Sequence, residues 1–138
     1  MDLQHAPEGL TQHVDMNAFN TLRLPCDAQY FVPVYQVDQL RAALSWARRE
    51  GVEVHVLGQG SNVVLAPHIE GLVIRIAIPG VSYEVDGNDV YLRAGAGVIW
   101  SALVDDSLAK GYCGLENLSL IPGTVGAAPI QNIGAYGV

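Results

Sequence analysis

The sequence is poor in basic residues, cysteines and uninterrupted apolar runs. Its 138 residues include seven Lys and Arg against fourteen Asp and Glu, a net charge of −7, which argues against binding nucleic acid or an anionic membrane by bulk charge. The only lysine is Lys110, so a Walker phosphate loop is excluded. No apolar run approaches the roughly 20 residues of a transmembrane helix, and the acidic, proline-containing start does not resemble a signal peptide.

Cysteines and histidines show no metal-ligand spacing. Cys26 and Cys113 form no CxxC pair, and the four histidines are scattered along the chain. We therefore expect a reduced, cytoplasmic protein with no metal site. Cys113 has no neighbouring base in the sequence, which favours a buried thiol over a nucleophile.

Charged residues are absent after Glu116. No Asp, Glu, Lys or Arg occurs between that residue and Val138. Because a domain rarely finishes on its least polar stretch, we expect this chain to be part of something longer. Glu116 is the last charge, and we expect its carboxylate to hold the following loop by accepting main-chain N–H groups.

The first half of the chain predicts a strand, a helix and a second strand. Tyr30–Val34 and Val52–Val56 have strand character, and Pro33 suggests an edge or a strand end. Between them, Asp38 is a candidate helix N-cap and Gly51 a candidate C′ residue. This βαβ pattern predicts a parallel pair of strands with a right-handed crossover. The helix face expected to be buried consists of Leu40, Ala43, Leu44 and Ala47.

The second half predicts a strand at Leu72–Ile76, a hairpin around Gly87-Asn88 and a helix over Val98–Lys110. We expect that helix to direct Ile99, Trp100, Leu103, Val104 and Leu108 toward a core, and Trp46 to pack in another. The resulting division is a polar, irregular N-terminal segment (1–19), a first lobe (20–70) and a second lobe (71–138).

The first candidate site is Gly58-Gln59-Gly60-Ser61-Asn62, directly after the second strand of the βαβ unit. Glycines let the main chain approach a ligand, and consecutive N–H groups in a tight turn bind anions. The carboxyl end of a parallel strand is also where open α/β sheets bind ligands. The third glycine of GxGxxG is replaced by Val63, so a purely structural turn remains an alternative to a phosphate site.

The second candidate is the uncharged segment from Ile121 to Gly137. It is too apolar for a solvated linker and too interrupted by Gly and Pro for a helix. It must therefore lie against either the protein core or a large ligand.

Taken together, these segments resemble the UDP-N-acetylenolpyruvoylglucosamine reductases (UDP-N-acetylmuramate dehydrogenases), which use FAD and NADPH in bacterial peptidoglycan synthesis. The resemblance extends from about Asn20 to the end of the chain. It is carried by Asn20-Thr21, Leu57–Asn62, Gly95-Ala96-Gly97 with Trp100, Gly114–Leu118, Ile121–Gly126 and Pro129–Gly137. The Pro129-Ile130-Gln131-Asn132 form is similar to the subgroup with the longer substrate-side domain.

The resemblance implies an α+β FAD-binding domain of the vanillyl-alcohol-oxidase (PCMH) type, with FAD extended between a small βαβ lobe and a second, mixed lobe. Tyr136 would then contact the substrate, and Ala127-Ala128 would lack a hydroxyl that relatives offer to FAD. The residues implied to bind FAD are Gly58, Gln59, Gly60, Ser61, Asn62, Ile121, Pro122, Gly123, Gly126, Ala128, Ile133, Gly134 and Ala135.

By the same resemblance, the parent protein would reduce UDP-N-acetylglucosamine enolpyruvate to UDP-N-acetylmuramate with hydride from NADPH. The family's catalytic serine, glutamate and arginine lie farther along the chain, and none maps onto residues 1–138. We therefore expect this piece to be inactive alone, without the C-terminal substrate domain, and to self-associate through exposed apolar surface. Two alternatives remain: an FAD-dependent oxidase on the same scaffold, and a non-enzymatic binding module.

Overall fold

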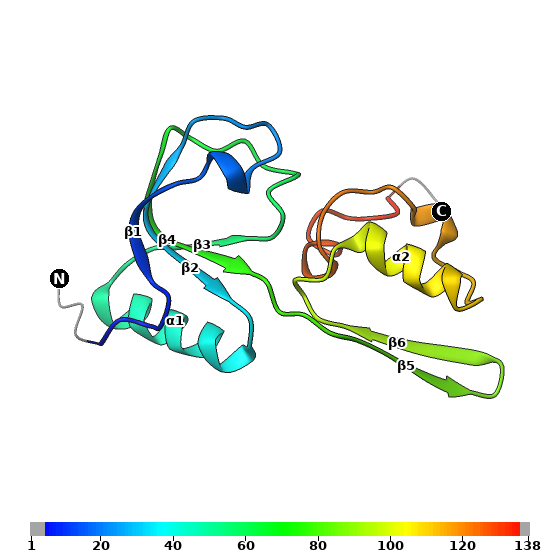
Figure 1. The fold of residues 1–138 in the computed structure, drawn as a ribbon. Coiled ribbons are helices and arrows are strands. Elements are labelled where there is room, and N and C mark those ends of the chain that lie inside the picture. Colours follow the sequence, from blue (N-terminus) through cyan, green and yellow to red (C-terminus); the bar gives the residue numbers. More distant parts are fainter. Residues whose placement is uncertain (1–4, 136–138) are drawn as a thin grey trace.

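The computed structural model describes residues 5–135 and shows two lobes joined by an extended segment (Figure 1). The first lobe contains a sheet with α1 on one face, and the second contains a hairpin, α2 and the C-terminal loops. The elements are β1 (Thr11–Asp15), η2 (Asn17–Phe19), β2 (Asp27–Val34), α1 (Val37–Glu50), β3 (Val54–Leu57), β4 (His68–Ile76), β5 (Val81–Asp86), β6 (Asp89–Ala94), α2 (Trp100–Ala109), η3 (Glu116–Leu118) and η4 (Val125–Ala127). None of the helices in the described part has the length and apolar composition needed to cross a membrane.

The first sheet has four strands in the order β1-β2-β4-β3. Strands β2 and β3 are both parallel to β4, but β4 lies between them, so the predicted direct pairing of the two strands of the βαβ unit is wrong. The burial of β4 explains its central place. Leu72, Val73 and Ile74 are consecutive and all buried, as expected for a strand covered on both faces. Val56 of β3 is 66% exposed, in keeping with an edge strand.

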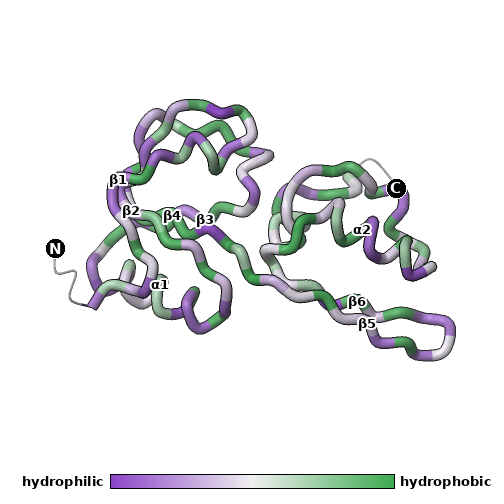
Figure 2. Tube along the Cα trace, viewed as in Figure 1, coloured by the Kyte–Doolittle hydropathy of each residue, from purple (hydrophilic) through white to green (hydrophobic). Residues whose placement is uncertain are grey.

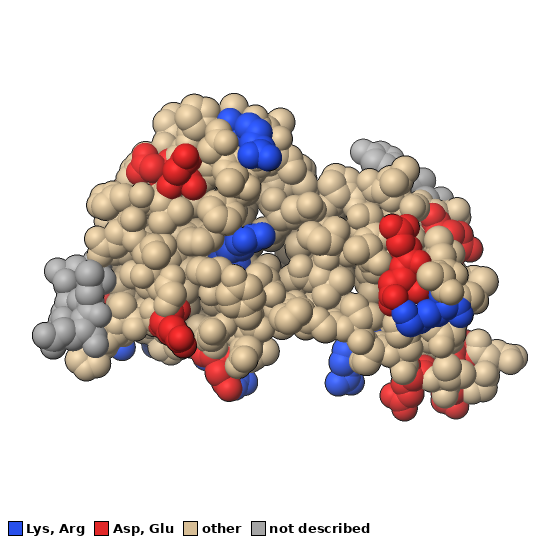
Figure 3. Space-filling model, viewed as in Figure 1, with Lys and Arg blue, Asp and Glu red and all other residues tan. Residues whose placement is uncertain are grey.

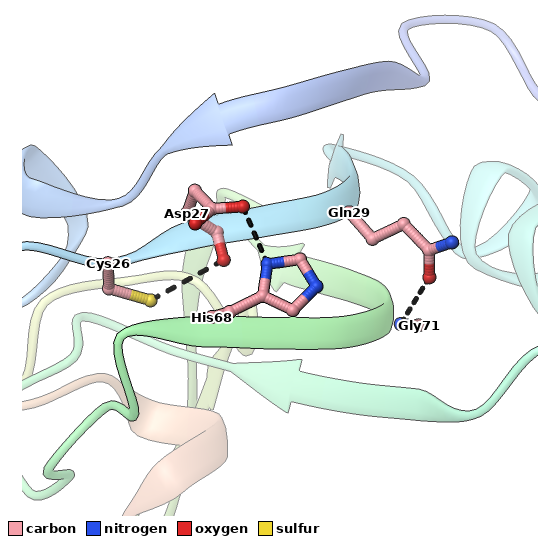
Figure 4. Close-up of polar contacts among 5 residues, drawn as sticks. All are labelled: Cys26, Asp27, Gln29, His68 and Gly71. Atoms are coloured by element: carbon pink, nitrogen blue, oxygen red, sulfur yellow. Dashed lines mark hydrogen bonds and ion pairs between the residues drawn. The ribbon is translucent and has the colours of Figure 1, made fainter.

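Polar contacts hold β2 against β4 where their register shifts between Ala28 and Tyr30 (Figure 4). The Gln29 side chain accepts a hydrogen bond from the main-chain N–H of Gly71 at 2.8 Å. The ring Nδ1 of His68 lies 2.6 Å from a carboxylate oxygen of Asp27. Side chains thus satisfy polar groups at the place where the regular ladder is interrupted.

The N-terminal segment is more regular than the sequence suggested. β1 pairs antiparallel with β2 and η2 follows it, so the expectation of an irregular segment over 1–19 is wrong. Four of the five β1 residues are exposed, and such a strand carries no apolar alternation that a sequence pattern could reveal. β1 ends its pairing opposite Phe31, so Pro33 lies where β2 is paired on one side only, which a residue without an N–H tolerates.

Helix α1 begins one residue earlier than its predicted cap. Gln36 occupies the N-cap position, and Asp38 lies in the first turn, where it pairs with Arg41 on the surface. Gly51 ends the helix with φ 68°, as predicted.

The buried face of α1 is formed by Ala43, Trp46 and Ala47. Leu44 is 43% exposed, so its predicted place on this buried face is wrong. The Trp46 ring packs edge-on against Tyr30 of β2, with centroids 5.3 Å apart. The large aromatic side chain therefore contributes to the packing of the helix on the sheet.

In the second lobe, the predicted hairpin is present as β5 and β6, with the Gly87-Asn88 turn between them. Trp100, Leu103 and Val104 of α2 are buried as expected. Ile99 and Leu108 are 38% and 43% exposed, so their predicted core positions are wrong. The predicted boundary at residues 70 and 71 cuts through β4, which belongs entirely to the first sheet; the sheet therefore extends to Ile76.

A polar cluster joins the hairpin to α2. The hydroxyl of Tyr83 donates to a carboxylate oxygen of Asp106 at 2.7 Å, and Lys110 pairs with the same carboxylate. Desolvation, followed by the hydrogen bond to Asp106, raises the pKa of Tyr83 to about 12. Hydrogen bonds from Lys110 and then from Tyr83 hold the pKa of Asp106 below its ordinary value.

The cluster predicts a pH dependence at both ends of the scale. Because the folded state lowers the pKa of Asp106, its contribution to stability is present above the ordinary carboxyl pKa and is lost as the pH falls through the lowered value. The contribution of Tyr83 is present below the ordinary phenol pKa and is lost as the pH rises through about 12. Tyr83→Phe should move the Asp106 pKa upward in a carboxyl NMR titration, and an unchanged titration would contradict the hydrogen bond.

Candidate functional site

The Gly58–Asn62 loop follows β3 at the carboxyl end of the parallel strands and is packed against the N-terminal segment. Gly60 is buried with φ 74°, and a Cβ at this position would lie 2.0 Å from the main-chain oxygen of Phe19. The Gly60 carbonyl accepts hydrogen bonds from Thr21, from its N–H at 3.0 Å and from its hydroxyl at 3.3 Å. The loop is therefore held in place by residues some forty positions earlier in the chain.

The N–H groups of this loop are available to a ligand. Within the described part of the chain, no acceptor receives a hydrogen bond from the main-chain N–H groups of residues 58–62. The loop borders a cavity of about 140 Å³, which Gly123, Ala127 and Gln131 also line. Consecutive free N–H groups at a strand end form a favourable environment for a phosphate or pyrophosphate group.

The second candidate segment lies beside the first. The Gly123 N–H donates to the side-chain oxygen of Gln59 at 2.8 Å. A Cβ on Gly58 would lie 2.8 Å from the hydroxyl of Thr124. The structure therefore brings together two glycine-rich segments that are about sixty residues apart in the sequence.

A larger cavity of about 380 Å³ continues from this contact. It is lined by Ser61 and Asn62 from the loop and by main chain and side chains of the C-terminal segment. The residues from that segment are Ile121, Pro122, Gln131, Asn132, Ile133, Gly134 and Ala135. Most of the predicted FAD-binding residues thus border one of two adjoining cavities.

Gly126 and Ala128 have a different placement. The Gly126 N–H donates to the carbonyl of Ala96 at 2.9 Å, and a Cβ there would lie 2.7 Å from the Ala96 side chain. Ala128 is 4% exposed and packs with Trp100 and Val104. Ala128 is therefore buried inside the second lobe, whereas Gly126 is exposed and packs against Ala96, and neither residue lines a cavity. Tyr136, the predicted substrate contact, lies outside the described residues.

The uncharged segment lies against protein core as well as along the cavities. Figure 2 shows hydrophobic residues in the loops that wrap around α2. Leu115, Leu118, Ile121, Val125 and Ile133 pack around the buried Trp100 cluster. The two alternatives for this segment are therefore compatible, since one side of it covers α2 while another borders the cavities.

Cys113 and Glu116 precede this uncharged segment, and the sequence made a prediction for each of them. The Glu116 carboxylate accepts a hydrogen bond from the main-chain N–H of Gly114, which precedes it, and not from the loop that follows, where the contact was expected. Hydrogen bonds from main-chain N–H groups, that of Glu116 itself first and then that of Gly114, hold its pKa below the usual range. Cys113 is exposed, so the expectation of a buried thiol at this position is wrong.

The sequence interpretation missed the role of Phe19 and did not single out Thr124 within the second candidate segment. Phe19 was not considered, and its main chain closes the loop over Gly60. Thr124 is 3% exposed, with its hydroxyl directed toward Gly58. A hydroxyl residue within an otherwise apolar run was the available signal for Thr124, whereas Phe19 had none because its contact is made by main-chain atoms.

The residues present fit an extended dinucleotide. Gly123 is buried at φ 123°, and a Cβ there would lie 3.1 Å from the side-chain nitrogen of Gln131 and 3.5 Å from the Ser61 hydroxyl. The side chain that glycine lacks would enter the contact between the two segments. Free N–H groups at one end and apolar side chains along the larger cavity match a pyrophosphate continued by flat aromatic groups.

The comparison with protein families agrees with this geometry. Residues 28–138 match the family described as FAD binding domain. The chain therefore belongs to this family of FAD-binding domains, and the α+β fold of the vanillyl-alcohol-oxidase type expected from the sequence is confirmed.

Two similar relatives are both named UDP-N-acetylenolpyruvoylglucosamine reductase. The chain is 48% identical over 128 residues to the UDP-N-acetylenolpyruvoylglucosamine reductase of Pseudomonas putida, covering 92% of this chain and 38% of that protein. It is also 48% identical over 133 residues to that of Ralstonia nicotianae, covering 94% and 39%. The resemblance inferred from the motifs is thus confirmed, and the chain spans about two fifths of the length of these relatives.

Two solved structures share the fold, and one of them carries the same name as these relatives. The crystal structure of UDP-N-acetylenolpyruvylglucosamine reductase from Thermus caldophilus superposes with a TM-score of 0.62 at 28% identity, covering 85% of this chain and 40% of that one. A solvent-stable cholesterol oxidase shares the fold, with a TM-score of 0.55 at 18% identity over 74% of this chain and 20% of that one.

Replacing Gln59 by methionine is expected to weaken flavin binding by about 3- to 10-fold, because the acceptor that holds Gly123 beside the loop is lost. Titration of flavin fluorescence measures this change. Gln12→Met in β1 is a matched control, since Gln12 is exposed and borders neither cavity. An equal loss of affinity in both variants would show that the Gln59 contact is irrelevant to the site.

Proposed function

We propose that this chain is the FAD-binding part of an NADPH-dependent reductase that converts UDP-N-acetylglucosamine enolpyruvate to UDP-N-acetylmuramate. The observation that carries the proposal is the meeting of the two glycine-rich segments, with free N–H groups in the Gly58–Asn62 loop. The names of the relatives support the reaction. The role would be in peptidoglycan synthesis in the cytoplasm, and therefore in cell wall biogenesis, cell shape and cell division.

In this proposal the residues of the chain bind and orient the cofactor. The main-chain N–H groups of residues 58–62 donate hydrogen bonds to the pyrophosphate, and Gln59 keeps Gly123 beside them. Ile121, Ile133 and Ala135 border the larger cavity and exclude water from the flat part of the cofactor. When bound, FAD would supply the hydride chemistry between NADPH and the enolpyruvyl double bond.

The remaining catalytic groups are proposed to lie elsewhere in the parent protein. The relatives are more than twice as long as this chain, which covers 38% and 39% of two of them. We propose that they carry the proton donor and the group that stabilises the enol, and that residues 1–138 alone are inactive. Tyr136 is proposed as a substrate contact. Leu120 and Ile130, 88% and 87% exposed, support self-association of the isolated piece, which light scattering would detect.

The test has two stages. Denaturing the purified parent protein should release FAD in stoichiometric amount, and its absence would refute the proposal. The parent should then oxidise NADPH catalytically, beyond the amount of bound FAD, only when UDP-N-acetylglucosamine enolpyruvate is present. Oxygen-dependent turnover of an alcohol without NADPH would identify an oxidase on the same scaffold instead. Loss of a protein partner in Gly60→Val and Gly123→Val, with no flavin in the wild type, would identify a binding module.

A further inference from the structure

Arg75 stands at the carboxyl end of β4, beside the Gly58–Asn62 loop. In the parallel ladder it is the partner of Leu57, the last residue of β3 and the residue directly before Gly58. Neighbouring strands lie about 4.8 Å apart. The start of the loop and the main chain of Arg75 are therefore adjacent across the sheet.

A second contact directs the Arg75 side chain. Its guanidinium carbon lies 5.1 Å from the centre of the Phe19 ring. Phe19 is also the residue whose main-chain oxygen closes against Gly60. The ring of Phe19 is itself supported by Phe31, with centroids 4.8 Å apart. The stacked rings of Phe19 and Phe31 thus hold the guanidinium on the face of the sheet opposite to α1. The Gly58–Asn62 loop lies on the same face, where Gly60 packs against the main chain of Phe19.

No carboxylate in the described part of the chain pairs with Arg75. All seven Lys and Arg residues lie in the described part of the chain, and Arg75 is the one among them that is not classed as exposed. No carboxylate of the described residues forms an ion pair with it, whereas Arg41, Arg49 and Lys110 each have one. Figure 3 shows a Lys or Arg side chain at the hollow between the lobes with no Asp or Glu beside it on the visible face.

We infer that Arg75 binds a phosphate group of the flavin nucleotide and supplies the positive charge that the free N–H groups of the loop lack. This inference rests on the proposed function and adds a residue to its cofactor site. Guanidinium groups bind phosphate oxygens in a bidentate manner. In a chain of net charge −7, a half-buried cation without an ion pair among the described residues is well placed to offset the phosphate charge.

This role is tested by measuring the FAD affinity of the full-length parent protein and its variants at low and at high salt concentration. Arg75→Gln should weaken FAD binding by about 10- to 100-fold and reduce its salt dependence, because one charge-assisted contact is lost. Arg75→Lys should fall between the wild type and Arg75→Gln, since it keeps the charge but not the planar fork. Arg93→Gln is the matched control, because Arg93 is exposed on β6 and should leave both properties unchanged.

The outcomes separate this inference from the proposed function. Wild-type protein that binds no FAD would refute both. FAD binding with the same affinity and salt dependence in wild type and Arg75→Gln would overturn the role of Arg75 alone. A loss of affinity that is the same at both salt concentrations, together with a lower melting temperature of the flavin-free variant, would show that Arg75 only supports the Phe19 stack.

Discussion

Replacing Gly60 by alanine should abolish FAD binding and lower the free energy of unfolding by about 2–5 kcal/mol. A Cβ at this position would lie 2.0 Å from the Phe19 oxygen and 3.0 Å from the Asn20 Cα, both main-chain atoms. Rotation of a side chain cannot relieve either overlap, so the loop must move away from the N-terminal segment. The left-handed backbone, φ 74°, adds a second cost for any residue with a side chain.

Gly51→Ala is the matched control for this prediction. Gly51 has nearly the same backbone conformation, φ 68°, but nothing lies within 4 Å of the position its Cβ would occupy. This variant should therefore lose only about 1–2 kcal/mol, the conformational part of the cost, and keep its flavin. Urea denaturation and flavin fluorescence measure the two effects. Equal losses in both variants would show that the contact with Phe19 contributes nothing.

Trp100→Ala should destabilise the second lobe by about 3–5 kcal/mol and weaken flavin binding as well. The indole ring is 9% exposed and packs with Val104 and Ala128. Its ring N–H donates to the Leu118 carbonyl at 2.9 Å, which ties the C-terminal segment to α2. Because that segment borders the cavities, a loss of packing beneath it should displace the residues that line the cofactor site.

Two phenylalanine variants separate the ring from its hydrogen bond. Trp100→Phe keeps much of the packing but leaves the Leu118 carbonyl without its donor, an additional cost of about 1 kcal/mol. Trp46→Phe makes a comparable change in volume, but the Trp46 ring nitrogen has no hydrogen-bond partner among the described residues. Trp100→Phe should therefore be the less stable of the two in thermal denaturation. The reverse order would contradict the importance of the Leu118 contact.

Local patterns predicted most elements of the fold. The Gly87-Asn88 turn predicted the β5–β6 hairpin, and Gly51 correctly marked the end of α1. Errors arose where burial depended on the rest of the molecule. Leu44, Ile99 and Leu108 fit helical periodicity but have no neighbouring element to cover them, and they are exposed. The order of the sheet was also hidden, because periodicity describes one strand at a time and says nothing about which strand lies beside it.

The candidate site, too, was predicted only in part from the sequence. Both glycine-rich segments, and the resemblance that links them to FAD, could be found from the sequence because glycine spacing and motif order are local properties. Gly126 and Ala128 belong to the same motif, but Ala128 is buried in the second lobe, Gly126 packs against Ala96, and neither borders a cavity. A linear motif does not distinguish residues that face a ligand from residues that support the loop.

The sequence by itself therefore determined the family, the cofactor class to propose and the two segments that would hold it. Only the tertiary structure decided that these segments meet, through Gln59 and Gly123, and that Phe19 and Arg75 lie beside them. The physical reason is that residue type and spacing control turns and short-range hydrogen bonds. Contacts between positions about forty to sixty residues apart depend on the order of strands in the sheet and on the packing of the two lobes.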